Sequence, residues 1–274
     1  MNLKKTLENF NRFGLINFIK TILKKLGINL NILDPIQRKR GYLSNKIQQI
    51  TKGVITSGLY KGTKLINSEK YFLAKSSQLL GCYEEEVQNE IKSLKEKYNF
   101  EYLVNLGAGE GFHSVGCLNN KIVQNVVNFE MIKKNRDTIE KNFQLNHIHK
   151  NFLNFSIADE TFLDLIKNNI ELKKNLFLFD IEGDEFRLLN ENILNELKNS
   201  YLIIELHHFY TTEQNKENFL EILKKKFQVK YVKTGSRNFS KFKILNNFND
   251  DEKWLMMSES RPKSMKWLIC EPKV

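Results

Sequence analysis

The sequence predicts an α/β fold in which a mostly parallel sheet, with one antiparallel strand at its edge, follows an N-terminal arm of helical and extended segments. Three observations predict this fold. Apolar runs of strand length recur from residue 101 onward, most segments between them are long enough for a crossover helix, and a glycine-rich turn, "NLGAGEG", follows the first run. A chain of 274 residues, 41% of them hydrophobic, can bury the core of one such domain with attachments.

The N-terminal arm is expected to span residues 1–98. Residues 1–30 place leucine, isoleucine and phenylalanine at roughly helical spacing with lysine between them, which predicts a basic amphipathic helix. Such a helix either docks on its own domain or on a second subunit, or it lies on an anionic membrane surface. After it, Pro35 and the basic stretch "QRKRG" predict a linker, residues 54–65 a hairpin or extended arm, and residues 83–98 a helix.

The main domain is expected to span residues 99–274. Its predicted strands are the apolar runs at 102–106, 125–130, 152–157, 176–180, 201–206, 228–233 and 266–271. Helices are predicted at 131–145, 186–198 and 213–226. No clear helix is indicated between the last two runs, so we expect these to form a terminal pair that supplies the antiparallel strand.

Composition and charge exclude several classes of protein. No window reaches the roughly 18 apolar residues that span a bilayer, and the N-terminus lacks the apolar core and cleavage site of a signal peptide. Cys82, Cys117 and Cys270 show no metal-ligand spacing, so neither a disulfide framework nor a zinc site is predicted, and a cytoplasmic location fits best. The net charge of +11 is spread over the whole chain, so it does not by itself indicate a nucleic-acid partner.

The glycine turn offers bare backbone N–H groups and a helix N-terminus to a ligand. A nucleotide-phosphate loop would need a lysine after the glycines, and a dinucleotide fingerprint would need glycine where Phe112 stands, which disfavours NAD. The remaining pattern, Asn105-x-Gly107-x-Gly109-x-Gly111, resembles the first motif of class I S-adenosylmethionine (SAM)-dependent methyltransferases. In those enzymes the turn wraps the methionine part of the cofactor.

Acidic residues follow two of the predicted strands. Glu130 ends the second strand about twenty residues after the turn, where a carboxylate can accept hydrogen bonds from both ribose hydroxyls. A solvated acid that opens the next helix is the other interpretation. Asp180 ends the fourth strand, so it is expected to project into the crevice beyond the carboxyl ends of the sheet, with Glu182 and Glu185 close behind it.

At these positions the chain resembles the FkbM family of methyltransferases. The matching stretches are "VNLGAGEGFHSVG", "NFEM", "SIADE", "LFDIEGDEFRLL" and "LIIELHH", and the segments that flank them are similar to those of a bacterial subgroup. The resemblance implies a seven-stranded Rossmann-like, SAM-binding sheet and O-methyl transfer, often to sugars or secondary metabolites. The cofactor-binding residues that it implies are Asn105, Gly107, Ala108, Gly109, Gly111, Phe112, Glu130, Met131, Ala158, Asp159, Asp180 and Glu182. Asn105 departs from the usual aspartate, and the missing charge is expected to lower the affinity for the cofactor.

Methyl transfer to a hydroxyl needs a group that removes the proton. Our hypothesis is that His207 is the general base, oriented by Glu205 or Glu182, and that Asp180 and Glu205 complete the catalytic set. His113 is a second candidate for the base. A divalent metal held by Asp180 with Glu182 or Glu205 is an alternative to a protein base.

Two further segments are candidates for contact with cofactor or acceptor. Tyr83 and Glu84 either close over the cofactor or simply begin a helix. Arg261, between the last two strands, either clamps an anionic group of the acceptor or is an ordinary surface arginine.

The function predicted from the sequence is SAM-dependent O-methylation of a saccharide or a small metabolite. An RNA ribose methyltransferase and a non-catalytic methyltransferase-like binding module are the alternatives. The proline-containing motif that commonly follows the fourth strand of amino-directed nucleic-acid methyltransferases is absent, since the only prolines are Pro35, Pro262 and Pro272. Peripheral membrane contact through residues 1–30 and homo-oligomer formation are open expectations.

Overall fold

The computed structural model describes residues 35–66, 74–168, 170–172, 174–259, 261 and 263–273. The helix predicted for residues 1–30 therefore lies outside the described residues. In the described part, none of the helices is long and apolar enough to cross a membrane.

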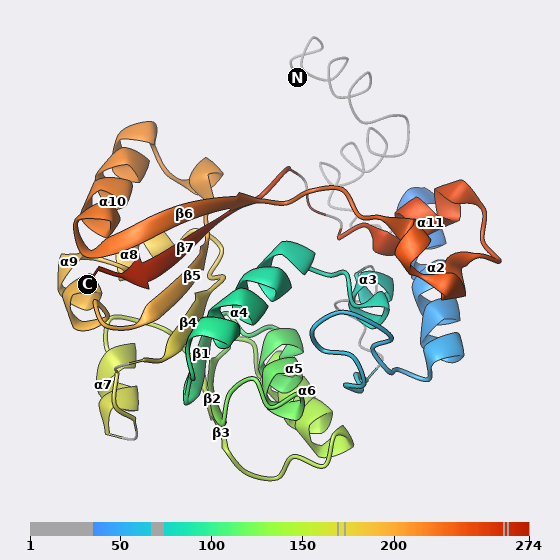
Figure 1. Ribbon diagram of the computed structural model, residues 1–274, viewed down its shortest axis with the longest axis horizontal. Coiled ribbons are helices and arrows are strands. Elements are labelled where there is room, and N and C mark those ends of the chain that lie inside the picture. The colour runs from blue at the N-terminus through green and yellow to red at the C-terminus, as the bar shows by residue number, and fades with distance from the viewer. Residues whose placement is uncertain are drawn as a thin grey trace, which may run out of the picture.

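The sheet has seven strands in the order β3-β2-β1-β4-β5-β7-β6, and it confirms the predicted fold class (Figure 1). The strands are β1 (Tyr102–Leu106), β2 (Asn125–Phe129), β3 (Phe152–Phe155), β4 (Leu176–Phe179), β5 (Tyr201–Glu205), β6 (Phe227–Lys233) and β7 (Lys266–Pro272). The pairs among β1 to β5 are parallel, and β7 runs antiparallel to both β5 and β6. Strand order reverses between β1 and β4, and this reversal is where a doubly wound sheet binds its ligands.

Alternating side chains of the sheet face two layers of helices. Leu103 and Ile203 belong to a core with α2 (Pro35–Thr51), α3 (Lys75–Leu80), α4 (Glu85–Lys97), α5 (Phe112–Asn119) and α11 (Asp250–Met257). Val104 and Leu202, the neighbours of those two residues, belong to the opposite core with α7 (Phe162–Lys167), α8 (Glu185–Leu188), α9 (Glu191–Glu196) and α10 (Glu213–Lys226). Because successive side chains of a strand point to opposite faces, these runs are apolar on both sides.

The N-terminal arm packs against a segment from the far end of the chain. In Figure 1, α2, α3 and α11 lie together at one end of the molecule, and two connecting segments of the chain run from the sheet to α11. Arg40 of α2 donates to the carbonyl of Ser258 at 2.7 Å, and Ser76 of α3 donates to the carbonyl of Met256 at 2.7 Å. Val54 and Lys64 form one antiparallel bridge, as expected of a hairpin.

Three predictions about helices were wrong. Pro35 and the stretch "QRKRG", expected to form a linker, are the first residues of the helix α2, whose start is compatible with proline because the first turn of a helix does not use that N–H. The segment between the last two strands does contain a helix, α11, which begins after Asn249; the side chain of this residue accepts from the N–H of Glu252 at 2.9 Å. The single helix predicted at 186–198 is instead two short helices, α8 and α9. Asn190 interrupts it in extended conformation and caps α9 through the N–H groups of Asn192 and Ile193. The remaining helix of the first layer, α6 (Lys133–Leu145), packs against α5.

The close packing of the arm on α5 generates a prediction about stability. A Cβ atom on Gly116 would lie 2.4 Å from the ring of Tyr60, which is fully buried. We expect Gly116→Ala to lower the free energy of unfolding by about 1–3 kcal/mol, because the ring or the helix must move. Urea-induced unfolding measures this change.

Gly235→Ala is the matched control. Its Cβ would meet only the carboxylate of Glu86 at 3.4 Å, so we expect a much smaller change in stability. Equal effects of the two substitutions would contradict the close approach of Tyr60 to α5.

Candidate functional site

A cavity of about 290 Å³ lies at the carboxyl ends of β1, β4 and β5, beside the reversal of strand order. Its lining comes from the glycine turn, from the ends of β4 and β5, from the start of α4 and from the segment before β7. The lining residues are Gln78, Tyr83, Glu84, Asn105, Gly107, Ala108, Gly109, Glu110, Phe112, His113, Leu178, Asp180, Glu182, Glu205, His207, Phe209, Tyr210, Glu259, Arg261, Met265 and Trp267. The cavity therefore joins the arm, the sheet and the C-terminal segment.

The glycine turn is pressed against the end of β4. Gly107 has φ +82°, and a Cβ at this position would lie 1.8 Å from the carbonyl oxygen of Asp180. The N–H groups of Gly107 and Ala108 both donate to the carbonyl of Phe129, at 2.9 and 3.0 Å. Only glycine tolerates both the left-handed conformation and this close approach, so the turn forms one wall of the cavity next to Asp180.

Glu130 fastens the turn to the end of β2. Its carboxylate accepts from the N–H of Gly109 at 2.8 Å and from the N–H of Ile132 at 2.8 Å, and the residue is buried. Each carboxylate oxygen has a second lone pair, so these contacts leave acceptor capacity for a ligand. Glu130 does not line the cavity, and its predicted contact with ribose hydroxyls stays a prediction.

Asn105 begins a chain of buried polar side chains. Its amide donates to the hydroxyl of Ser114 at 2.9 Å, Ser114 donates to Asn128 at 2.5 Å, and Asn128 donates to Asn154 at 2.9 Å. This chain needs a donor at position 105, which an ionised aspartate cannot supply. Asparagine in place of the usual aspartate therefore keeps the side chains of this network hydrogen-bonded to one another.

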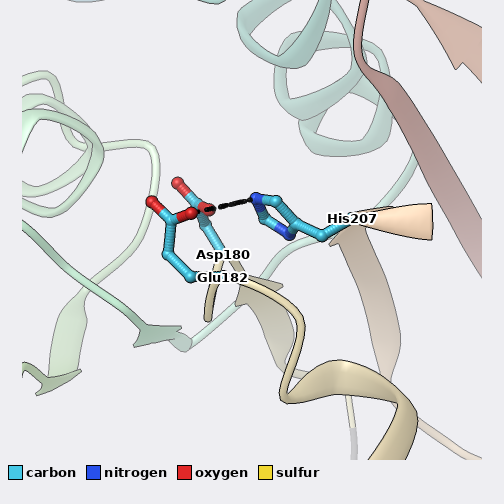
Figure 2. Close-up of side chains that lie close together, drawn as sticks. All are labelled: Asp180, Glu182 and His207. Carbon is cyan, nitrogen blue, oxygen red and sulfur yellow. Dashed lines mark ion pairs between the residues drawn. The ribbon is translucent and has the colours of Figure 1, made fainter. Parts of the chain in front are cut away.

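Figure 2 shows His207 facing the two acids that follow β4. Its Nε2 lies 3.6 Å from Oδ1 of Asp180, 3.7 Å from Oε2 of Glu182 and 3.8 Å from Oε2 of Glu205. The parallel pairing of β4 with β5 brings these strand ends together, as the sequence predicts. Burial lowers the pKa of His207, but the neighbouring carboxylates, Glu185 first among them, raise it above the ordinary value overall.

The carboxylate closest to the ring of His207 belongs to Glu185, although the sequence pointed to Glu205 or Glu182 as the orienting acid. Oε1 of Glu185 lies 3.3 Å from Nδ1 and accepts from the backbone N–H of His207 at 2.7 Å. Its other oxygen accepts from the N–H of Gly183 at 2.9 Å, and the side chain is fully buried. Glu185 thus holds His207 on the Nδ1 side of the ring, opposite Nε2.

Asp180 and Glu205 are coupled carboxyl groups. Burial raises the pKa of Asp180 to about 6, and burial together with the charge of Asp180 raises the pKa of Glu205, against the lowering effect of Arg261. Two neighbouring buried carboxyl groups repel each other when both are ionised. Asp180 and Glu205 therefore share one proton near neutral pH.

Arg261 neutralises the acids on the other side of the cavity. Its guanidinium binds the carboxylates of Glu84, Glu205 and Glu259, the last at 2.7 Å. Burial would raise the pKa of Glu84, but Arg261 and His113 hold it at about 2. The guanidinium is therefore occupied by carboxylates of its own chain, which opposes the predicted role of Arg261 as a clamp for an anionic acceptor.

Both ring nitrogens of His113 have partners. Nε2 lies 2.7 Å from Oε2 of Glu84, and Nδ1 lies 2.9 Å from the hydroxyl of Tyr60. A base needs a free nitrogen that faces the reacting group, so this arrangement favours His207 over His113. The role of His207 as a general base stays a prediction.

The cavity brings together most, but not all, of the predicted site residues. Gly111, Glu130, Met131, Ala158 and Asp159 do not line it; Met131 is exposed, and Asp159 binds Thr161. Several lining residues were not predicted as site residues, namely Gln78, Glu110, Leu178, Phe209, Tyr210, Glu259, Met265 and Trp267. Phe209 and Tyr210 had a local signal, since they directly follow the two histidines after β5.

Comparison with known proteins shows the fold. No family model and no curated protein sequence matches the chain. Among solved structures, a human methyltransferase 10 domain containing protein superimposes with a TM-score of 0.53 at 12% identity, over 89% of this chain and 98% of that one. An O-methyltransferase from Bacillus cereus in complex with SAH gives 0.44 at 11% identity, over 92% and 97% of the two chains. The seven-stranded sheet is that of the class I methyltransferases.

The contacts of Arg261 lead to a prediction about stability. We expect Arg261→Ala to lower the free energy of unfolding by about 3 kcal/mol, because it leaves several buried carboxylates without their cation. Denaturant unfolding at neutral pH measures the change.

Arg187→Ala serves as the control, since this arginine binds Glu160 and Asp184 on the surface and should cost at most about 1 kcal/mol. A loss for Arg261→Ala no larger than that of the control would show that the acids do not depend on Arg261.

Proposed function

We propose that this protein is a SAM-dependent methyltransferase that transfers a methyl group to a hydroxyl of a saccharide or small metabolite. The observation that carries the proposal is the glycine turn packed on Asp180, beside a cavity at the reversal of strand order. Ligands of doubly wound sheets bind at this place. The resemblance of the motifs to the FkbM family supports O-methylation as the type of reaction.

The charge of the cavity favours SAM over nucleotides with a pyrophosphate. Glu84, Asp180, Glu182, Glu205 and Glu259 line it, whereas its cationic side chain, Arg261, is bound to acids. A sulfonium and an ammonium group are attracted to such a lining, and a pyrophosphate is repelled. The same argument disfavours RNA as the acceptor, because each of its phosphates carries a negative charge.

The proposed arrangement of the cofactor follows the turn. The methionine part lies along residues 107–109, and the ribose lies toward Glu130 at the end of β2, where the carboxylate keeps free lone pairs beside the N–H of Gly109. The reacting methyl group then points toward the ends of β4 and β5. This placement puts Asp180 and His207 next to the acceptor.

The chemical step is an in-line displacement at the methyl carbon. The acceptor oxygen forms a bond to this carbon while the carbon–sulfur bond breaks, so S-adenosylhomocysteine (SAH) leaves with the electron pair. In the absence of a metal ion, Nε2 of His207 accepts the hydroxyl proton, with Asp180 beside it. The chain positions the acceptor and excludes water, and Phe209 and Tyr210 form part of the wall on that side.

The ligand specificity is tested by thermal unfolding of the purified full chain with SAH, NAD and ATP in parallel. At 100 times its dissociation constant a ligand stabilises the folded state by about 2.7 kcal/mol, which raises Tm by roughly 5–10 °C for a domain of this size. We expect SAH alone to raise Tm, and Glu130→Ala to remove most of the increase.

Each variant is compared with its own ligand-free melting curve, because Glu130→Ala also removes two backbone hydrogen bonds. Glu140→Ala, an exposed acid on α6, is the control and should keep the full shift. A shift with NAD or ATP in place of SAH, or no shift with any of the three, would refute the proposed function.

A further inference from the structure

We propose that Asp180, Glu182 and His207 hold one divalent cation, and that this ion coordinates the acceptor hydroxyl. Binding of the ion is independent of the methyltransferase proposal, but its role in the reaction rests on that proposed function. The three side chains come from the ends of two neighbouring strands, and Figure 2 shows them converging on one point.

The donor atoms have a spacing close to that of metal ligands. Nε2 of His207 lies 3.6 Å from Oδ1 of Asp180 and 3.7 Å from Oε2 of Glu182, and the donor atoms of all three residues lie within 4.8 Å of one another. Ligands about 2.1 Å from one ion lie roughly 3.0–3.5 Å apart at octahedral to tetrahedral angles. The side chain of Glu182 is 80% exposed, so its carboxylate can move toward the other two donors.

His207 is a nearly buried imidazole whose Nε2 makes no hydrogen bond among the described residues. Its side chain is only 4% exposed, and the surrounding carboxylate oxygens lie beyond hydrogen-bond distance. Nε2 therefore faces the two carboxylates without a hydrogen bond, and a cation among these three groups would supply its partner.

The opposite side of the ring has the arrangement found behind metal-binding histidines. Such a histidine usually donates its second N–H to a carboxylate, which fixes the tautomer and the direction of the ring. Nδ1 of His207 lies 3.3 Å from Oε1 of the fully buried Glu185 and has no other partner among residues 35–273 as far as they are described, so a small rotation of the ring completes this hydrogen bond. With a proton on Nδ1, Nε2 is free to bind a metal.

A second set of acids near the cavity is less suited to a cation. Glu84, Asp180 and Glu205 also lie close together, but Arg261 binds both Glu84 and Glu205, and His113 binds Glu84. The negative charges of Glu84 and Glu205 are therefore already balanced. The set that contains His207 has no arginine or lysine bound to it among the described contacts, so it is the one with a charge left to neutralise.

The donor set selects a class of ion. Two carboxylates suit Mg²⁺, Mn²⁺ and Ca²⁺, and the imidazole favours a transition metal, so Mn²⁺ fits the whole set best. Three protein ligands leave positions for water and for the acceptor. Coordination lowers the pKa of the acceptor hydroxyl, so the oxygen gives up its proton to water and then takes the methyl group as SAH leaves.

Binding of Mn²⁺ to the full chain tests the site without any acceptor. The free ion is followed by its electron paramagnetic resonance signal during titration, and Mg²⁺, Ca²⁺ and Zn²⁺ are added as competitors. We expect one Mn²⁺ per chain, and Glu182→Gln and His207→Ala should each weaken binding by at least about tenfold.

Two substitutions close to Glu182 and His207 in the sequence serve as controls. Asp184→Asn removes an acid that binds Arg187 on the surface, and His208→Ala removes a histidine outside the cavity lining; both should bind Mn²⁺ as the wild type does. Because Glu182 is mostly exposed and glutamine has the same shape, we expect Glu182→Gln to keep the wild-type Tm, which is measured on the same sample. Wild-type protein that does not bind Mn²⁺, or Glu182→Gln that binds it normally, would overturn the proposal.

SAH binding is measured on the same samples in EDTA. Mn²⁺ binding without SAH binding supports the metal site and refutes the methyltransferase proposal. SAH binding without Mn²⁺ binding overturns the metal site and leaves the enzyme with His207 as its base. His207→Ala distinguishes the two roles directly, because a histidine that acts only as a base is not needed for Mn²⁺ binding.

Discussion

The carbonyl of Asp180 occupies the space that a side chain on residue 107 would need, and the rest of the site depends on this contact between the ends of β1 and β4. The N–H of Asp180 also donates to the carbonyl of Leu106 at 2.9 Å, so the parallel ladder continues past the last paired residues of the strands. The chain then turns to opposite faces of the sheet after β1 and after β4, with α5 in one core and α8 in the other. The crevice between these turns is fixed by backbone contacts, and side chains supply only its chemistry.

That chemistry is acidic in a protein with a net charge of +11. Arg261 links acids from α4, from the end of β5 and from the C-terminal segment, so it closes one side of the cavity and neutralises it. Asp180, Glu182 and His207, on the other side, have no arginine or lysine partner in the part of the chain that the structure describes. The side of the cavity with Arg261 is therefore held by ion pairs of the chain itself. The side with His207 has carboxylates that a bound cation could neutralise. Under the proposed function, this side receives the cationic methyl end of the cofactor and the proposed divalent ion.

Much of the sheet could be predicted from the sequence, because fully buried parallel strands are continuous apolar runs such as "LFLF" between polar segments. Adjacent parallel strands end at one edge, so the meeting of Asp180 with His207 could be predicted as well. The network of Arg261 could not, since it joins residues 177 positions apart with no local pattern. The helix α11 had a local signal, Asn249 followed by acids, but its short apolar stretch is weak evidence without α2 and α3 to pack against. Glu185 is the first residue of α8, and only the fold shows its contact with His207.

The most direct test of the account is a crystal structure of the full chain with SAH and Mn²⁺. We expect the homocysteine part along residues 107–109, the ribose at Glu130 and the sulfur directed toward the ends of β4 and β5, with Mn²⁺ bound by Asp180, Glu182 and His207. SAH bound away from the glycine turn would contradict the assignment of the cavity. SAH in the predicted place with Mn²⁺ elsewhere would keep the cofactor site and refute the metal site.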